Sequence, residues 1–237
     1  MKAKDPKERK LLPSIERFDA LLITPYHQEF EQIPLIYQLQ KPTLGFYSTS
    51  LDFGYEKVEC RTVFWMPASW GNRRYDKKFI ELNTKLDTCE WIKTYGSKEF
   101  KKIYPQTYQY PISFESGALE KEIQNNGICL VIHGEEHFQM GLPTARIFEA
   151  FSAGAILICD KNRFVEKYFS DCVFFIDTTL SSDEIFFQIQ THYEYIMTHQ
   201  EEALKKAKKG YQIFKEQFTM EKQLLDLLEF HNQIFGL

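Results

Sequence analysis

Two oppositely charged side chains, Arg146 and Glu149, stand near the start of a predicted helix in the middle of the chain. They lie three residues apart, so they share one face of that helix. The first turn of a helix presents unpaired backbone N–H groups and the positive end of the helix dipole, which together suit a phosphate. A cation close to the phosphate and a carboxylate one turn further on, able to accept ribose hydroxyl hydrogens, describe a nucleotide site. The alternative interpretation is a solvated surface ion pair, which contributes little.

The sequence on either side predicts the elements that position this pair. An apolar, β-branched run at residues 128–132 predicts a buried strand, and a polar loop is predicted at residues 135–141. Pro143 is predicted to be the first helical residue, because its missing N–H costs nothing there. Gly154 is predicted to end the helix as a left-handed cap, before a second apolar run at residues 155–159. Strand, loop, helix and strand predict one βαβ unit of a parallel sheet.

The remaining chain predicts further alternation of strands and helices. Strands are predicted at residues 18–24, 43–47, 63–66, 89–96, 108–114 and 173–176, and helices at 75–86, 119–126, 163–169 and from 183 onward. Alternating elements of this kind predict an α/β fold with parallel sheets.

Residues 143–160, PTARIFEAFSAGAILICD, resemble the donor-binding segment of GT-B glycosyltransferases, in particular the group 1 bacterial family and its spore-maturation-like relatives. The shared pattern is Pro, a small residue, Arg, an aromatic residue, Glu-Ala, then Ala-Gly and a strand. The positions that fit it are Thr144, Arg146, Phe148, Glu149, Ala150, Ala153 and Gly154. The similarity covers about residues 89 to the C-terminus and is specific between residues 130 and 177.

The resemblance implies a GT-B-like fold with two Rossmann-like lobes, each built on a parallel sheet. We expect an abbreviated N-terminal, acceptor-side lobe at residues 1–88, because this part holds fewer βα units than a full GT-B N-terminal domain. Residues 89–237 are expected to form the C-terminal lobe, which binds the nucleotide-sugar donor and carries the terminal helices. The last helix, near residues 220–235, is expected to return to the N-terminal lobe.

Seven residues are predicted to bind the donor: His133, Thr144, Ala145, Arg146, Glu149, Gly96 and Lys98. His133 ends the central strand at its carboxyl edge, where ligands of open α/β sheets bind. A polar residue with purely local partners is the alternative. Lys98 follows Gly96 and Ser97 and would reach phosphate oxygens as a point charge, unless it is an exposed first-turn lysine.

One position departs from the family pattern. Many members carry a second Glu eight positions before the residue that matches Glu149, and that position here is Gly141. The missing carboxylate ordinarily contacts the sugar. Glu135 and Glu136 in the preceding loop are substitutes whose spacing does not match.

The predicted catalytic residues come from the N-terminal section. His27 and Glu29 follow the first predicted strand, and either could be the base that activates an acceptor hydroxyl if this lobe faces the donor. A capping or surface role is the alternative. No cofactor and no catalytic metal are expected, because the chain has no Asp-x-Asp motif and similar GT-B enzymes generally need no metal. A metal site at His137 with the two neighbouring glutamates is a less favoured interpretation than an acidic loop.

Composition limits the function classes. The chain has 237 residues, with 43% hydrophobic and 26% charged residues, as is usual for a soluble globular protein. A net charge of −4 argues against a nucleic-acid partner, which would favour a basic protein. The five cysteines show no CxxC spacing, which predicts a reducing cytoplasm and neither a disulfide framework nor a zinc site. The basic cluster at residues 205–210 is interpreted as a solvated face, with a membrane-surface contact second.

We therefore predict a metal-independent hexosyltransferase that moves a sugar from a nucleotide diphosphate to a glycan or other hydroxyl acceptor. Cell-surface polysaccharide synthesis, in the cytoplasm or at the inner face of the membrane, is the role that the resemblance implies. The alternative is a non-catalytic GT-B-like module that binds a nucleotide or a protein partner within a larger synthase.

Overall fold

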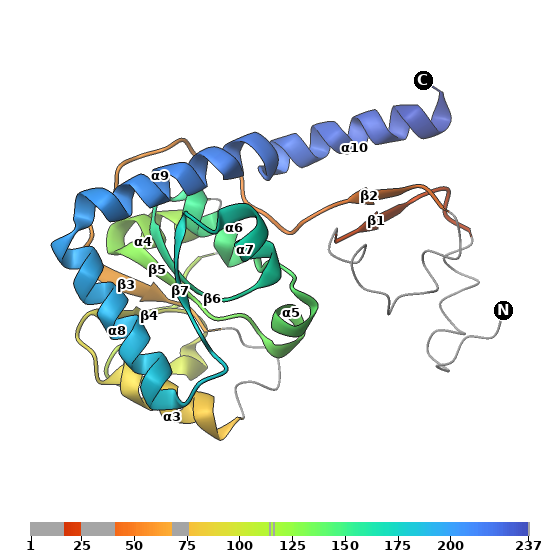
Figure 1. The fold of residues 1–237 in the computed structure, drawn as a ribbon. Coiled ribbons are helices and arrows are strands. Elements are labelled where there is room, and N and C mark those ends of the chain that lie inside the picture. Colours follow the sequence, from red (N-terminus) through yellow and green to blue (C-terminus); the bar gives the residue numbers. More distant parts are fainter. Residues whose placement is uncertain (1–16, 25–40, 68–75, 114, 116, 237) are drawn as a thin grey trace. The chain divides into compact units, whose positions relative to one another are not determined.

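The computed structural model describes residues 17–24, 41–67, 76–113, 115 and 117–236 (Figure 1). The predicted catalytic residues His27 and Glu29 lie outside these ranges. The chain divides into two compact units: unit 1 comprises Met1–Ser48 and Glu221–Leu237, and unit 2 comprises Thr49–Met220. No helix in the described part of the chain is both long and apolar enough to cross a membrane.

Unit 1 contains a short parallel sheet and the last helix. Strand β1 (Leu21–Ile23) pairs in parallel with β2 (Thr43–Gly45). Helix α10 (Met220–Phe235) contributes the buried side chain of Gln223, whose carboxamide accepts from the backbone N–H of Tyr47 and donates to its carbonyl. The C-terminal helix therefore packs in the same unit as the N-terminal segment, as the sequence predicted.

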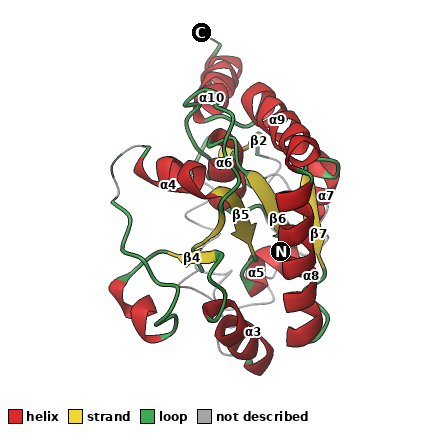
Figure 2. Cartoon of the chain, turned by 90° about the vertical axis from the view of Figure 1, so that its left-hand side faces the viewer, coloured by secondary structure: helices red, strands yellow, loops and turns green. Residues whose placement is uncertain are grey.

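Unit 2 is a five-stranded parallel sheet with helices on both faces (Figures 1 and 2). The strand order is β4-β3-β5-β6-β7. The strands are β3 (Thr62–Trp65), β4 (Ile92–Thr94), β5 (Gly127–Val131), β6 (Ile156–Asp160) and β7 (Val173–Ile176). The helices are α3 (Lys77–Asp87), the 3-10 helix η3 (Lys98–Lys102), α4 (Ala118–Asn126), α5 (Glu135–Met140), α6 (Ala145–Ser152), α7 (Arg163–Phe169), α8 (Ser182–Thr198) and α9 (Gln200–Gln217).

Alternate strand residues point to opposite faces of this sheet. Val63 and Trp65 of β3 belong to the apolar cluster that contains the buried residues of α3 and α8. Phe64 faces the other side, where it stacks on Tyr95 with ring centroids 4.8 Å apart. Figure 2 shows α4 and α6 on this second side, and α3 beside α8 on the first.

The central helix α6 is buried on the second face. Its Ile147, Phe148 and Phe151 are fully buried, which the 3.6-residue spacing predicted. Helix α9 approaches α6 at Gly210, where an added Cβ would lie 2.1 Å from the ring of Phe151. Gly154 has φ +69° and follows the end of α6, so the predicted left-handed cap is confirmed.

The sheet contains a topological switch between β3 and β5. From β3 the chain passes through α3 to β4 on one side, and then through α4 to β5 on the other side of β3. Connections that leave neighbouring strands in opposite directions open a crevice at the carboxyl ends of those strands. The fold therefore points to this edge as the place for a ligand.

The division between units differs from the expected boundary between residues 88 and 89. Strand β3 was assigned to the N-terminal lobe, yet it pairs with β4 and with β5, inside the sheet of unit 2. The reason is long-range pairing: Val63 lies opposite both Ile92 and Ile128, and an apolar strand alone does not specify which sheet it joins.

Three local predictions were wrong. The strand predicted at residues 108–114 is absent from its described part, where Tyr108 forms only an isolated bridge with Thr94. The loop predicted at 135–141 is mostly helix α5, which ends at Gly141 with φ +65°. Pro143 lies two residues before the first helical residue of α6, whose N-cap is Thr144.

Candidate functional site

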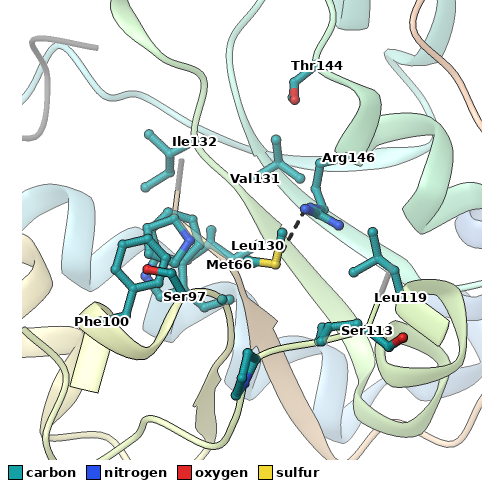
Figure 3. A pocket seen from close by; sticks show the side chains of 15 residues that line it. Met66, Ser97, Phe100, Ser113, Leu119, Leu130, Val131, Ile132, Thr144 and Arg146 are labelled. Atoms are coloured by element: carbon teal, nitrogen blue, oxygen red, sulfur yellow. Dashed lines mark hydrogen bonds between the residues drawn. The ribbon is translucent and has the colours of Figure 1, made fainter. Parts of the chain in front are cut away.

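A cavity of about 580 Å³ lies at the carboxyl edge of the sheet, at the switch between β3 and β5 (Figure 3). Its lining comes from the ends of these strands, the segments after β4 and before α4, the first turn of α4 and the start of α6. The lining residues are Trp65, Met66, Pro67, Gly96, Ser97, Phe100, Pro111, Ile112, Ser113, Leu119, Leu130, Val131, Ile132, Thr144 and Arg146. Most are apolar, and Arg146 alone is charged among the lining residues that the structure describes.

Arg146 is fixed by three contacts. One guanidinium nitrogen, Nη2, donates to Met66 Sδ at 3.7 Å, and the group lies 5.6 Å from the centre of the Phe64 ring. Its Nη1 lies 2.8 Å from Glu149 Oε2. Figure 3 shows the guanidinium reaching toward Met66 from the α6 side of the cavity. These contacts position a cation at the cavity wall and leave its side chain 14% exposed.

Glu149 lies beside Arg146 rather than in the cavity lining. Its side chain is 18% exposed, and burial raises the pKa of its carboxyl group, although the charge of Arg146 acts in the opposite direction. Neither Nη1 of Arg146 nor Oε2 of Glu149 has a well-aligned hydrogen bond within the described residues, so their contact is chiefly electrostatic. The predicted face-sharing pair is confirmed, and it is not the solvated surface pair of the alternative. Direct contact of Glu149 with a ribose stays a prediction.

The start of α6 supplies the other predicted groups at this wall. Thr144 is the N-cap, but its side chain makes no capping hydrogen bond, and it lines the cavity. Ala145 is the first helical residue. The first N–H groups of a helix lack acceptors within it, so this end can receive an anion.

The opposite wall depends on Gly96 and the segment that follows β4. Gly96 has φ +124°, and a Cβ there would lie 2.5 Å from the Phe100 ring, so the position requires glycine. The buried carboxylate of Asp87 accepts hydrogen bonds from the backbone N–H groups of Gln106 and Thr107 and from the hydroxyl of Thr107. These bonds anchor the segment that leads to Pro111, Ile112 and Ser113 of the lining.

His133 is not among the residues that line the cavity. Its side chain is fully buried, and its Nδ1 lies 2.6 Å from Asp160 Oδ1, which also accepts the backbone N–H of His133. The hydroxyl of Thr178 lies 3.5 Å from the other carboxylate oxygen. The structure thus shows the local hydrogen-bond partners of the alternative interpretation, and a donor contact of His133 stays a prediction.

Lys98 also lies away from the cavity lining. It is exposed at the first position of η3, as the alternative interpretation of an exposed first-turn lysine expected. Its preceding residues, Gly96 and Ser97, do line the cavity.

The potential metal ligands that the structure brings together differ from those considered in the sequence. Within the described residues, His133, Cys159 and Asp160 bring ligand atoms within 4.8 Å of one another. The hydrogen bond between His133 and Asp160 explains this proximity without an ion. His137 with Glu135 and Glu136 does not form such a group in the described part of the chain.

Gly141 occupies a backbone position that disfavours the family's second Glu. Its φ is +65°, and a Cβ would lie 2.9 Å from the Cβ of Arg163. A side chain here would meet both backbone strain and a steric conflict. The local structure at the end of α5 therefore favours glycine over glutamate at position 141.

Several residues of the site were not predicted. Met66 and Phe64 hold Arg146, but the strand that carries them was placed in the other lobe. Asp160 follows the second apolar run and was not predicted as a partner of His133. The signal that could have found Asp160 is its position at the carboxyl end of a strand adjacent to His133.

The comparisons with known proteins agree with this architecture. The glycosyl transferase-like family profile matches residues 70–229. S. aureus TarM, in a crystal structure with UDP, aligns with a TM-score of 0.62 and 11% identity over 98% of this chain and 48% of that chain. The pneumococcal O-GlcNAc transferase GtfA, in complex with UDP and GlcNAc, aligns with a TM-score of 0.60 and 15% identity over 98% and 48%. A glycosyltransferase from Rickettsia africae gives a TM-score of 0.64 and 9% identity over 99% and 68%.

These likenesses have a defined extent. The chain spans about half the length of TarM and GtfA. No curated protein matches it. Identities this low show only that the fold is shared. The family profile shows family membership, because it covers more than half of the sequence. The chain belongs to the glycosyl transferase-like family and has the GT-B fold that its sequence predicted.

Proposed function

We propose that unit 2 binds the nucleotide diphosphate of a sugar donor in the cavity at the β3–β5 switch, and that the protein transfers this sugar to a hydroxyl acceptor. The observation that carries the proposal is Arg146, the one charged side chain among the described lining residues, beside the N-terminus of α6. A cation and unpaired backbone N–H groups on one wall suit the two phosphates.

The rest of the cavity suits the nucleoside. Its apolar lining, including Trp65, Phe100 and Ile112, would cover a planar base, and Ser97 and Ser113 add hydroxyl groups that can donate or accept hydrogen bonds. TarM and GtfA, which share the fold, were crystallised with UDP.

The chemistry of transfer requires the departing diphosphate to be stabilised as negative charge develops on it. Arg146 and the α6 terminus supply this stabilisation from the cavity wall, where Met66, Phe64 and Glu149 hold the guanidinium beside the site before any ligand arrives. In the proposed role the base comes from His27 or Glu29, no metal or cofactor takes part, and the acceptor is a glycan or another hydroxyl compound. We place this activity in cell-surface polysaccharide synthesis, in the cytoplasm or at the inner face of the membrane.

Calorimetry tests the proposal directly. UDP, GDP and CMP are titrated into the full chain, and at least one nucleoside diphosphate should bind with one site per chain. Transfer and donor hydrolysis are then measured with UDP-, GDP- and CMP-sugars. Absence of binding by both diphosphates, UDP and GDP, would contradict the proposal.

A second candidate is a non-catalytic GT-B-like module that binds a nucleotide. It is favoured by Gly141, whose left-handed backbone and contact with Arg163 leave no room for the carboxylate that contacts the sugar in many relatives. This candidate predicts nucleotide binding without transfer or hydrolysis of any donor in the panel.

A further inference from the structure

The guanidinium of Arg146 has two competing partners, the Glu149 carboxylate and any anion bound in the cavity. Nη1 of Arg146 is 2.8 Å from Glu149 Oε2, and the same guanidinium lines the cavity. An anion in the cavity and the Glu149 carboxylate would therefore share one cation. Glu149 is not among the lining residues, so it faces the ligand only through Arg146.

The negative charge of Glu149 is stabilised chiefly by the guanidinium of Arg146. Its side chain is 18% exposed, and the described residues give Oε2 no well-aligned hydrogen bond. A buried carboxylate that loses its counter-charge becomes costly, and it is stabilised by neutralisation. Diphosphate oxygens compete well for Arg146, because a guanidinium forms short, charge-assisted hydrogen bonds with phosphate.

We propose that a diphosphate bound at Arg146 draws the guanidinium away from Glu149, and that the Glu149 carboxylate then takes up one proton from solution. This inference rests on the proposed function and makes Glu149 a positioning residue: it holds Arg146 in the empty site and releases it to the ligand. The step balances as one carboxylate plus one proton giving one carboxylic acid, and no covalent bond of the ligand changes.

The surroundings of Glu149 favour this direction. Burial raises the pKa of Glu149, the charge of Arg146 lowers it, and charge repulsion from Glu120 on α4 raises it further. Cys129 on β5 also faces the pair, but burial raises its thiol pKa to about 12, so it stays neutral near pH 7. When the ligand takes Arg146, both remaining influences on Glu149 favour the protonated form.

Proton uptake by Glu149 makes nucleotide binding depend on pH. A carboxyl group whose pKa is higher in the complex than in the free protein binds a proton on complex formation. Nucleotide affinity is then greatest at low pH and falls as pH rises through the pKa of Glu149 in the complex. For one coupled proton the fall approaches about tenfold per pH unit.

The experiment measures proton uptake by calorimetry. UDP, GDP and inorganic pyrophosphate are titrated into the full chain in phosphate-free buffers of different ionisation enthalpy, from about pH 6 to pH 8. Uptake of close to one proton per ligand supports the proposal. Glu149→Gln, which mimics the protonated acid, should abolish the uptake of this proton and bind the ligand more tightly than the wild type at the upper end of this range.

The variants separate the possible failures. Glu166→Gln, an exposed carboxylate on α7, is the matched control and should retain wild-type uptake. It also accounts for titration of the nucleotide's own phosphate. Binding without uptake, or weaker binding by Glu149→Gln, would overturn the proposal in favour of a direct ribose contact and leave the proposed function intact. Absence of binding by all three ligands would overturn both.

A ligand-free measurement tests the physical basis. In Arg146→Met, Glu149 lacks its counter-charge, so its folded-state pKa should rise above the unfolded value and stability should fall with increasing pH. Arg146→Met/Glu149→Gln should lose this pH dependence. Identical pH profiles for the single and double variants would overturn the proposal even if nucleotides bind.

Discussion

Two pairs of titratable side chains lie near the same edge of the unit 2 sheet, and they differ in burial and in what surrounds them. The side chains of His133 and Asp160 are both fully buried, and His133 Nδ1 lies 2.6 Å from Asp160 Oδ1. Asp160 also accepts the backbone N–H of His133. The side chains of Arg146 and Glu149 are partly exposed, Arg146 Nη1 lies 2.8 Å from Glu149 Oε2, and Arg146 lines the cavity. In the sealed pair, His133 and Asp160, protein groups supply hydrogen bonds to the carboxylate, whereas the cavity pair, Arg146 and Glu149, leaves a cation that a ligand can engage.

This difference separates a structural role from a binding role. Asp160 ties β6 to the end of β5, so it stabilises the edge from which the cavity residues Val131 and Ile132 extend. Arg146 is held by weaker contacts to Met66 and Phe64, which permit a change of partner. Substitutions in the two pairs should therefore affect different quantities.

The largest effect is expected for Asp160→Ala. Removing this carboxylate leaves the ring and backbone N–H of His133 buried without their acceptor, which should lower the free energy of unfolding by about 3–5 kcal/mol. Urea denaturation measures it. The exposed carboxylate in Asp171→Ala is the control, with a small loss or none, because a solvated ion pair contributes little. A loss of that small size for Asp160→Ala would show that the two pairs do not differ in this way.

Arg146→Ala should have the next largest effect, on binding. Loss of a charge-assisted contact should weaken the better of UDP and GDP by about 1.5–3 kcal/mol, on the order of 10- to 150-fold. Calorimetry on folded protein measures the affinity, and Lys205→Ala on the exposed face of α9 is the matched loss of a cation. Equal affinities for the wild type and Arg146→Ala would show that the diphosphate does not bind at the N-terminus of α6.

Glu149→Gln should change stability much less than Asp160→Ala. The substitution removes the charge attraction to Arg146, but it also removes the cost of a buried carboxylate, and these terms offset each other to within about 1 kcal/mol. Thermal and urea unfolding at pH 7 measure the change. A loss of about 3 kcal/mol or more would make this pair as structural as the sealed one.

Lys98→Ala should have the smallest effect. The side chain is exposed at the start of η3 and does not line the cavity, so stability should change by less than about 0.5 kcal/mol. Nucleotide affinity should also stay within about twofold, since the interaction of an exposed charge outside the cavity lining is screened by salt. A loss comparable to that of Arg146→Ala would restore Lys98 as a phosphate ligand, as the sequence predicted.

The sequence alone determined most of the local structure. The apolar runs became β5, β6 and β7, the 3.6-residue spacing became α6, and Gly154 ended that helix with a positive φ. Arg146 and Glu149 share a face because they are three residues apart on a helix. These features depend on near neighbours in the chain, whose geometry the residue types and spacing already specify.

Tertiary structure decided which elements meet. Strand β3 joined the sheet of unit 2 through partners far along the chain, and this brought Met66 and Phe64 to Arg146. Likewise, Asp160 reached His133 across 27 residues because β5 and β6 are adjacent. Apolar strands with similar patterns can pair in several orders, so neither contact can be read from local spacing. That pairing determines whether a charged side chain is buried or lines a cavity. Asp160 is fully buried for this reason, whereas Arg146 lines the cavity.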